Sequence, residues 1–200
     1  MSSRRGGPRT GPATDARARS ARAPGGGRTG AEPADPWAMA RQICLDLLTT
    51  RARTRAELAT ALARRGVGKD IVDGVLARFS EVGLIDDAAF AQHYVHAGHT
   101  HRGLGRRALT AQLRRRGVDE QTTGEAVAAV EPAAEEEMAR ILVRRRLASD
   151  ATPAGGEVVV IRKLVGMLAR RGYPEGLSYR VIRDELRTAG RDTAPLDDVD

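Results

Sequence analysis

Apolar residues recur along this chain at helical spacing, in a unit that occurs three times. Each unit has two leucines four residues apart: Leu58 and Leu62, Leu109 and Leu113, Leu164 and Leu168. Each pair leads into Arg–Arg–Gly, at 64–66, 115–117 and 170–172, so the glycines lie 51 and 55 residues apart. Spacings of three and four put apolar side chains on one helix face. A period near fifty predicts a tandem array of small helical units.

Two more apolar stripes complete each unit. The stripe after the glycine comprises Ile71, Val72, Val75 and Leu76, then Ala126, Val127 and Val130, then Leu177, Val181 and Ile182. The stripe before the leucines puts on one face Trp37, Ala40, Cys44 and Leu47, then Phe90, Tyr94 and Ala97, then Met138, Ile141 and Leu142. The pattern therefore predicts three helices per unit.

Residues suited to helix ends stand between the stripes. Thr54 with Glu57 predicts a capping box. The other signals are Asp86 and Asp119 as N-caps, Pro132 and Pro174 in first turns, and Glu135–Glu137 and Arg144–Arg146 at opposite ends of one helix. The segment 155–164, GGEVVVIRKL, has the β-branched residues of a strand. Its register in the repeat places it in a second helix, and we expect a helix.

The predicted fold is all-α: an elongated tandem array of three three-helix repeats with a disordered basic N-terminal tail. The expected boundaries are 1–33 for the tail, 34–84, 85–130 and 131–190 for the repeats, and 191–200 for an acidic tail. Seven arginines against two acidic residues give segment 1–33 a charge of +5, with little to bury. It is either a solubilising segment or a salt-sensitive nucleic-acid arm.

The charge balance indicates an anionic partner. The net charge is +7, and the partner classes that fit are nucleic acid, a membrane surface or an acidic protein. The single cysteine, Cys44, excludes an intramolecular disulfide and reads as a buried apolar residue rather than a reactive thiol. No apolar run is long enough for a membrane span, and the start lacks the apolar core of a secretory signal, so we expect a cytoplasmic protein.

The two arginines of each RRG run have different predicted positions. The glycines suit the left-handed position that ends a helix. Arg65, Arg116 and Arg171 fall at the edge of the apolar stripe, where their stems can pack. The preceding arginines lie about 200° around the helix from the buried leucine and must face outward. We expect these outward arginines, Arg64, Arg115 and Arg170, either to contact a partner or simply to be solvated.

A basic linker and all four histidines lie in the second unit. Arg102, Arg106 and Arg107 gather at a helix start, where positive charge opposes the helix dipole and hints at a binding surface. The histidines, His93, His96, His99 and His101, could include a metal pair but otherwise read as polar-face residues. No catalytic or nucleotide-binding motif is present, which favours a binding protein without cofactor or metal over an enzyme.

The segment GLIDDAAFAQHYV at 83–95, followed by a basic linker and RRALTAQLRRRGV at 106–118, resembles the RecX family of bacterial regulatory proteins. The resemblance spans about residues 36–187. It implies a curved array of three helical repeats that binds the RecA–DNA filament in its groove and inhibits the recombinase, ATPase and co-protease activities of RecA. Family members commonly carry further arginines where this chain has HAGHTHR at 96–102, so partner contacts do not transfer residue by residue there.

We therefore expect a monomer that binds the RecA filament, with weak nonspecific binding to DNA. The alternative is a sequence-independent DNA-binding protein, since a three-helix unit of this size suits a helix-turn-helix variant. The candidate partner-binding residues are Arg64, Arg102, Arg106, Arg107, Arg114, Arg115, Arg144, Arg145 and Arg170.

Overall fold

The computed structural model describes residues 35–149 and 156–194, and in these ranges the chain forms nine α-helices and no strand. The helices are α1 (Pro36–Thr50), α2 (Arg55–Ala63), α3 (Lys69–Glu81), α4 (Asp87–Thr100), α5 (Arg106–Arg115), α6 (Glu120–Ala128), α7 (Pro132–Ser149), α8 (Gly156–Arg170) and α9 (Glu175–Thr188). The expected disordered tail at 1–33 and the acidic residues after 194 lie outside these ranges.

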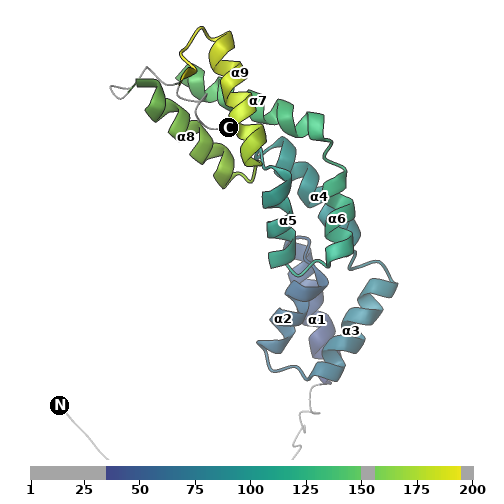
Figure 1. The fold of residues 1–200 in the computed structure, drawn as a ribbon. Coiled ribbons are helices and arrows are strands. Elements are labelled where there is room, and N and C mark those ends of the chain that lie inside the picture. Colours follow the sequence, from purple (N-terminus) through teal and green to yellow (C-terminus); the bar gives the residue numbers. More distant parts are fainter. Residues whose placement is uncertain (1–34, 150–155, 195–200) are drawn as a thin grey trace, which may run out of the picture. The chain divides into compact units, whose positions relative to one another are not determined.

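The helices form three consecutive three-helix repeats, α1–α3, α4–α6 and α7–α9 (Figure 1). Each repeat has its own apolar core. The paired leucines of the sequence pattern are the centre of each core, and all six are at most 1 % exposed. This arrangement confirms the predicted all-α array of three-helix repeats.

Most helix ends follow the sequence signals. Asp86 and Asp119 cap α4 and α6 through their side chains, and α7 begins at Pro132. Pro174, expected in a first turn, is instead the N-cap of α9. Thr54 Oγ1 accepts the Glu57 amide at 3.1 Å, but the Glu57 carboxylate does not close a capping box. That carboxylate pairs with Arg51 and Arg116 instead, and charge-assisted hydrogen bonds of this kind are stronger than a bond to a neutral amide.

The segment with a strand-like composition is the start of α8. Val160 and Ile161 are buried there on the face that also carries Leu164 and Leu168. Burial of this face outweighs the local β propensity, which is weak against tertiary packing. Compared with α2 and α5, the helix is extended: Ile161 is the repeat equivalent of Arg55 and Arg106, yet α8 begins five residues earlier, at Gly156.

The stripes predicted for the first helices are confirmed in part: Ala40 and Cys44 of α1 are buried as predicted, but each repeat also has a stripe residue that is exposed. Trp37 and Ile141 are 42 % and 37 % exposed, and Ala97 is exposed as well. The buried positions of α4 are Ala91 and Val95, and those of α7 include Ala139 and Val143. Phe90 and Tyr94 are half-buried, pack against the core of the second repeat as predicted and also contact the Arg116 guanidinium. The predicted stripes therefore contain both core positions and positions at the exposed edge of the core.

The joint between the first two repeats is built on the start of α2. Thr54 Oγ1 donates a hydrogen bond to the Arg116 carbonyl oxygen at 2.6 Å. The Arg55 amide donates to Asp87 Oδ1 at 2.9 Å, and the Arg116 guanidinium pairs with Glu57 Oε1 at 2.6 Å. Amides at a helix start have no partner within the helix, so the next repeat supplies one.

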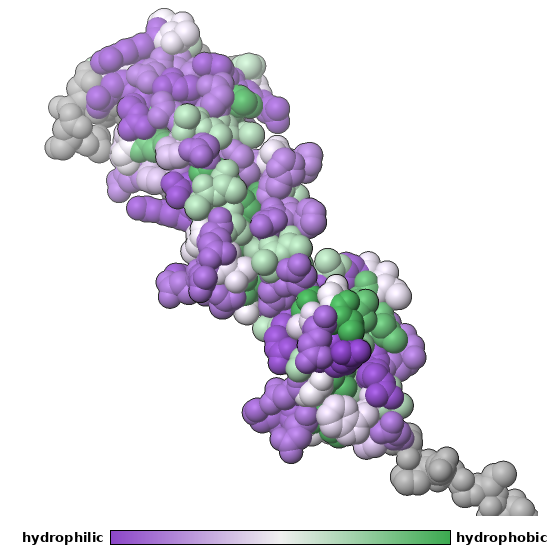
Figure 2. All heavy atoms as spheres, turned by 90° about the vertical axis from the view of Figure 1, so that its right-hand side faces the viewer, coloured by the Kyte–Doolittle hydropathy of each residue, from purple (hydrophilic) through white to green (hydrophobic). Residues whose placement is uncertain are grey.

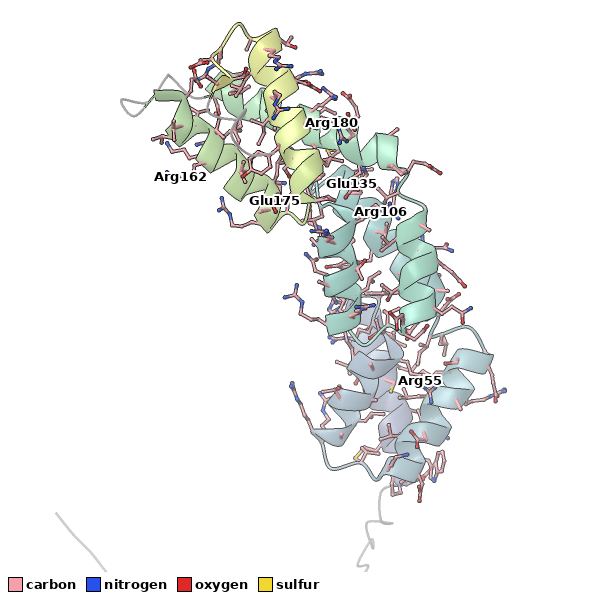
Figure 3. All side chains as sticks on the ribbon, viewed as in Figure 1. Arg55, Arg106, Glu135, Arg162, Glu175 and Arg180 are labelled. Atoms are coloured by element: carbon pink, nitrogen blue, oxygen red, sulfur yellow. The ribbon has the colours of Figure 1, made fainter. Side chains whose placement is uncertain are left out.

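The joint between the second and third repeats uses the same positions. The Gly105 amide donates to the Arg171 carbonyl oxygen at 2.8 Å, and the Arg106 amide donates to Glu135 Oε1 at 2.7 Å. Arg106 and Glu135 meet where the second and third repeats join (Figure 3). Arg171 Nη1 donates to the Arg102 carbonyl oxygen at 2.5 Å. In both joints, therefore, the start of the second helix of one repeat packs on the end of the second helix of the following repeat: α2 on α5, and α5 on α8.

The glycine of each RRG run has the predicted left-handed backbone, with φ of 77°, 77° and 81° at Gly66, Gly117 and Gly172. Two of them have a further role. A Cβ atom at Gly117 would overlap Ala56, and one at Gly172 would overlap Ala108. At Gly66 such an atom would meet nothing within 4 Å. The two later glycines therefore allow the close approach of neighbouring repeats.

The second arginine of the run behaves differently in the first repeat. Arg116 and Arg171 are half-buried in the joints, whereas Arg65, expected to pack along its stem, is exposed. No described residue occupies the position of a preceding repeat, so no part of such a repeat packs on Arg65 within the described ranges. The predicted equivalence of the three arginines is wrong at Arg65 for this reason.

Candidate partner-binding grooves

The outward arginines lie where the sequence predicts them. Arg64, Arg115 and Arg170 are all exposed, and each directly follows or ends the second helix of its repeat. Each also lines an open groove in the surface of the array. The three grooves are described in turn along the chain.

The first groove crosses the joint between α2 and α5 and has a volume of about 480 Å³. It is lined by Arg51, Arg53, Ala56, Glu57, Thr60, Ala61 and Arg64 of the first repeat and by Arg114, Arg115, Arg116 and Gly117 of the second. Six arginines face one carboxylate here. Because Glu57 already pairs with Arg51 and Arg116, the groove presents a net positive surface.

The second groove crosses the joint between α5 and α8 and has a volume of about 620 Å³. Its cationic side chains are Arg107, Arg115 and Arg170, and its floor includes Ala108, Ala111, Val165 and Ala169. Glu175, at the start of α9, is its one acidic residue. Small apolar residues beneath arginines suit an anionic partner that approaches the helix backbone closely.

The third groove lies along α8, and its volume is also about 620 Å³. It is lined by Arg146 of α7 and by Arg162, Lys163, Met167 and Arg170 of α8. Figure 3 shows Arg162 on the side of α8 turned away from α9. Four of its five residues are cationic, and none is acidic.

Shared residues connect the three grooves. Arg115 lines the first and the second groove, and Arg170 lines the second and the third. The grooves therefore form a continuous cationic run along the second helices of the three repeats. Clustered like charges with few carboxylates attract an anionic partner and make its binding sensitive to salt.

The arginines of the basic linker separate into two groups. Arg107 is exposed and lines the second groove. Arg106 is half-buried, and its backbone amide donates to Glu135. The Arg102 guanidinium lies 4.8 Å from the centre of the Tyr94 ring, which it covers from the side of the linker. Of the three, Arg107 has the position most open to a partner.

Tyr94 sits between two guanidinium groups, because Arg116 lies 4.9 Å from the same ring centre. Its hydroxyl hydrogen-bonds Gln112. Burial opposes ionisation, but hydrogen bonds and charge from Arg102 and Arg116 prevail and lower the pKa of Tyr94 below its ordinary value. These contacts hold the linker and the first joint together.

The remaining candidates, Arg114, Arg144 and Arg145, have three different surroundings. Arg114 lines the first groove and pairs with Glu120 at 2.6 Å. Arg144 is bound by the buried Glu185, whose oxygens lie 2.8 and 2.9 Å from it, so its charge already serves the contact between α7 and α9. Arg145 is exposed and lines none of the three grooves.

Sequence reasoning did not include six cationic residues that line the grooves: Arg51, Arg53, Arg116, Arg146, Arg162 and Lys163. Arg51 and Arg53 directly precede the cap of α2, and the α8 pair lies on the face opposite the buried leucines. For Arg162 and Lys163, the position two and one residues before the core residue Leu164 is the signal that could have found them. Arg51 and Arg53 lie between two helices, where helical spacing gives no such signal.

A fourth groove, of about 690 Å³, is lined by Arg106, Arg107, Thr110, Ala111, Arg114, Val127, Glu135 and Pro174. Figure 2 shows a mostly hydrophilic surface in which apolar areas are small and separated. His93, His96 and His101 are exposed, but His99 is buried and its Nδ1 lies 3.1 Å from the Leu104 carbonyl oxygen, so it is not a polar-face residue. In the described ranges, no group of three or more potential ligands is arranged for a metal ion.

Cys44 is buried in the first core, and that burial raises the pKa of its thiol despite nearby Arg65. This agrees with its reading as an apolar packing residue. None of the helices in the described parts of the chain is both long enough and apolar enough to cross a membrane.

Comparison with known proteins identifies the repeats. Residues 40–79 match the model of the first three-helix domain of RecX, and residues 86–127 match that of the second. The chain is 54 % identical over 167 residues to the regulatory protein RecX of Thermobifida fusca, covering 84 % of this chain and 88 % of that one. It is 47 % identical over 163 residues to the RecX of Mycolicibacterium smegmatis, covering 80 % and 86 %.

Solved structures show the same fold. The crystal structure of RecX from Lactobacillus salivarius superposes with a TM-score of 0.65 at 19 % identity, covering 76 % of this chain and 97 % of that one. A second crystal structure of a regulatory protein RecX gives 0.62 at 26 % identity, covering 76 % and 73 %. The order of the repeats, the family models and the identity to these relatives agree: the chain belongs to the RecX family of regulatory proteins.

Proposed function

We propose that this protein binds RecA and the RecA–DNA filament and inhibits the recombinase, ATPase and co-protease activities of RecA. The proposal is supported by membership of the RecX family. The observation that carries it is the repetition of Arg64, Arg115 and Arg170 along connected grooves. A cation repeated once per unit suits a partner whose own binding positions repeat, as those of a polymer do.

The proposed mechanism is occupation of a surface and involves no catalytic step or cofactor. A monomer in the cytoplasm would bind along the filament through its second helices and stabilise one filament state or block access to the groove. Arg107 and Arg114 line the same run and belong to the proposed surface. Arg102, Arg106, Arg144 and Arg145 remain secondary candidates.

The test is the triple substitution of Arg64, Arg115 and Arg170 by Ala. Its matched control is Arg41, Arg78 and Arg187 to Ala, which removes the same charge from exposed positions that line none of the three grooves. We expect the groove variant to bind RecA–DNA filaments about tenfold more weakly and to inhibit RecA ATPase less. The control should bind like the wild type. Equal loss in both variants would mean that only net charge matters.

A second function, sequence-independent DNA binding, is favoured by the third groove with its four cations. The two functions are separated by measuring binding to RecA filaments and to bare DNA at matched salt. Binding to DNA alone would fall steeply with salt, because phosphate contacts release counterions. Equal affinity for filament and bare DNA would favour the second function.

A further inference from the structure

The first repeat has an RRG end that no described residue covers. In the other two repeats this end holds the preceding repeat, because the Arg116 carbonyl oxygen accepts from Thr54 and the Arg171 carbonyl oxygen accepts from Gly105. Arg65 and Gly66 are exposed, and within the described residues no group donates to the Arg65 carbonyl oxygen. Among residues 35–149 and 156–194, this end therefore has the backbone of a joint and no residue that occupies it.

The apolar part of a joint is also open at this end. Met39 precedes buried Ala40 as Phe90 precedes buried Ala91, so the two are repeat equivalents. Phe90 is half-buried and has the Arg116 guanidinium 5.7 Å from its ring centre. Met39 is 43 % exposed. By repeat equivalence, Met39 thus has the helix position from which Phe90 contacts the second arginine of its own RRG run.

The two existing joints define what such a face accepts. In each, the occupant is the first turn of a helix with an alanine against the RRG glycine, Ala56 on Gly117 and Ala108 on Gly172. In the first joint the same turn carries Glu57, which pairs with Arg116. A helix start that brings a small residue and a carboxylate therefore matches this geometry and charge.

A second copy of this chain does not supply that occupant by continuing the array. The equivalent position in its third repeat lies inside α8, which begins five residues earlier, so the backbone amides there are already bonded within the helix. We propose that Met39, Arg65 and Gly66 form a docking face for the first turn of a partner protein's helix, with a small residue and a carboxylate in that turn.

This face is a weaker joint than the two internal ones. Pro36 stands where Asp87 and Glu135 accept an amide of the docked helix, so one acceptor is missing. Fewer contacts give a reversible association, which suits an exchangeable partner better than a permanent neighbour. The proposal rests on the proposed function in one respect: RecA in its filament is the partner to be tested.

The test compares Gly66→Asn with Gly83→Asn. Both glycines have positive φ, 77° and 72°, and open space around the Cβ position, and Asn tolerates this backbone. Both variants should therefore fold and unfold alike in urea. A side chain at Gly66 would exclude the docked helix, as it would at Gly117 or Gly172. We expect Gly66→Asn to bind RecA filaments on DNA about tenfold more weakly and Gly83→Asn to bind like the wild type.

The outcomes distinguish the two proposals. If the wild-type protein does not bind the RecA filament, the proposed function is wrong. If the wild type binds, the groove variant fails and both Asn variants bind normally, then the grooves act and this docking face does not.

A second measurement identifies the occupant. A photo-crosslinking residue at Met39, exposed in the free protein, should link to RecA when the filament is present. Cross-links that map only to residues 1–33 of the same chain, or disappear when these residues are deleted, would show an intramolecular occupant and overturn the proposal.

Discussion

Arg116 pairs with Glu57 at 2.6 Å across the boundary between the first two repeats, and its guanidinium also lies 4.9 Å from the centre of the Tyr94 ring. One side chain thus joins a carboxylate of α2 to an aromatic residue of α4. The sequence motif that ends a helix is also the motif that connects two repeats.

Replacement of Arg116 by Ala should lower the free energy of unfolding by about 2 kcal/mol, since a half-buried pair and two ring contacts are lost. Replacement of Arg65 by Ala, at the equivalent but exposed position, should change it by less than about 0.5 kcal/mol. Urea unfolding of both variants measures the difference. Equal losses would show that the joint contributes nothing beyond the helix end.

The three RRG glycines allow a graded test. Gly66→Ala should cost about 1 kcal/mol, the strain of Ala in a left-handed conformation. Gly117→Ala and Gly172→Ala should each cost about 3 kcal/mol or more, because the added Cβ also overlaps the neighbouring repeat. Chemical denaturation measures the free energy of unfolding of each variant, and equal losses in all three would contradict the prediction.

Glu135 is 4 % exposed and accepts the Arg106 amide at 2.7 Å. Glu135→Ala should cost about 1–3 kcal/mol, because the amide is left without an acceptor in the joint. Glu135→Gln keeps a carbonyl oxygen at this position and should cost less. Amide hydrogen exchange at Arg106 should accelerate in the Ala variant only. Acceleration in both variants would mean that the negative charge, and not the acceptor atom, secures the joint.

Glu136 gives the third repeat a dependence on acid. Hydrogen bonds from Arg180, at 2.8 Å, and from Arg140, at 2.6 Å, lower the pKa of this carboxyl. A lowered folded-state pKa gives stability that is present above the unfolded value, about 4.3, and is lost as pH falls through the folded value. Glu136→Gln should therefore cost about 1 kcal/mol at pH 7 and little at about pH 3. Urea midpoints at both pH values check this, and a pH-independent cost would contradict it.

The cores and most helix ends could be predicted because they depend on local spacing. The six leucines, the left-handed glycines and the caps at Asp86 and Asp119 follow from residues within one turn of each other. The outward position of Arg64, Arg115 and Arg170 follows in the same way.

The joints could not be predicted, because their partners are far apart in sequence. Glu135 looked like an ordinary first-turn acid, and nothing in its neighbourhood indicates that it accepts an amide 29 residues earlier. Phe90 and Tyr94 pack against the core as predicted, but their spacing does not indicate that the Arg116 guanidinium lies over both rings. The grooves depend on these joints, which is why only part of their lining was identified.

The early start of α8 bears on how the length of such a protein can change in evolution. Where α2 and α5 offer a helix start to the next repeat, α8 offers a continuous helix. If a gene duplication appended another repeat after the third, the RRG end of that repeat would have no helix start in α8 to pack against. New repeats would have to be inserted between existing ones. The third repeat therefore limits the number of repeats at the C-terminal end of the array.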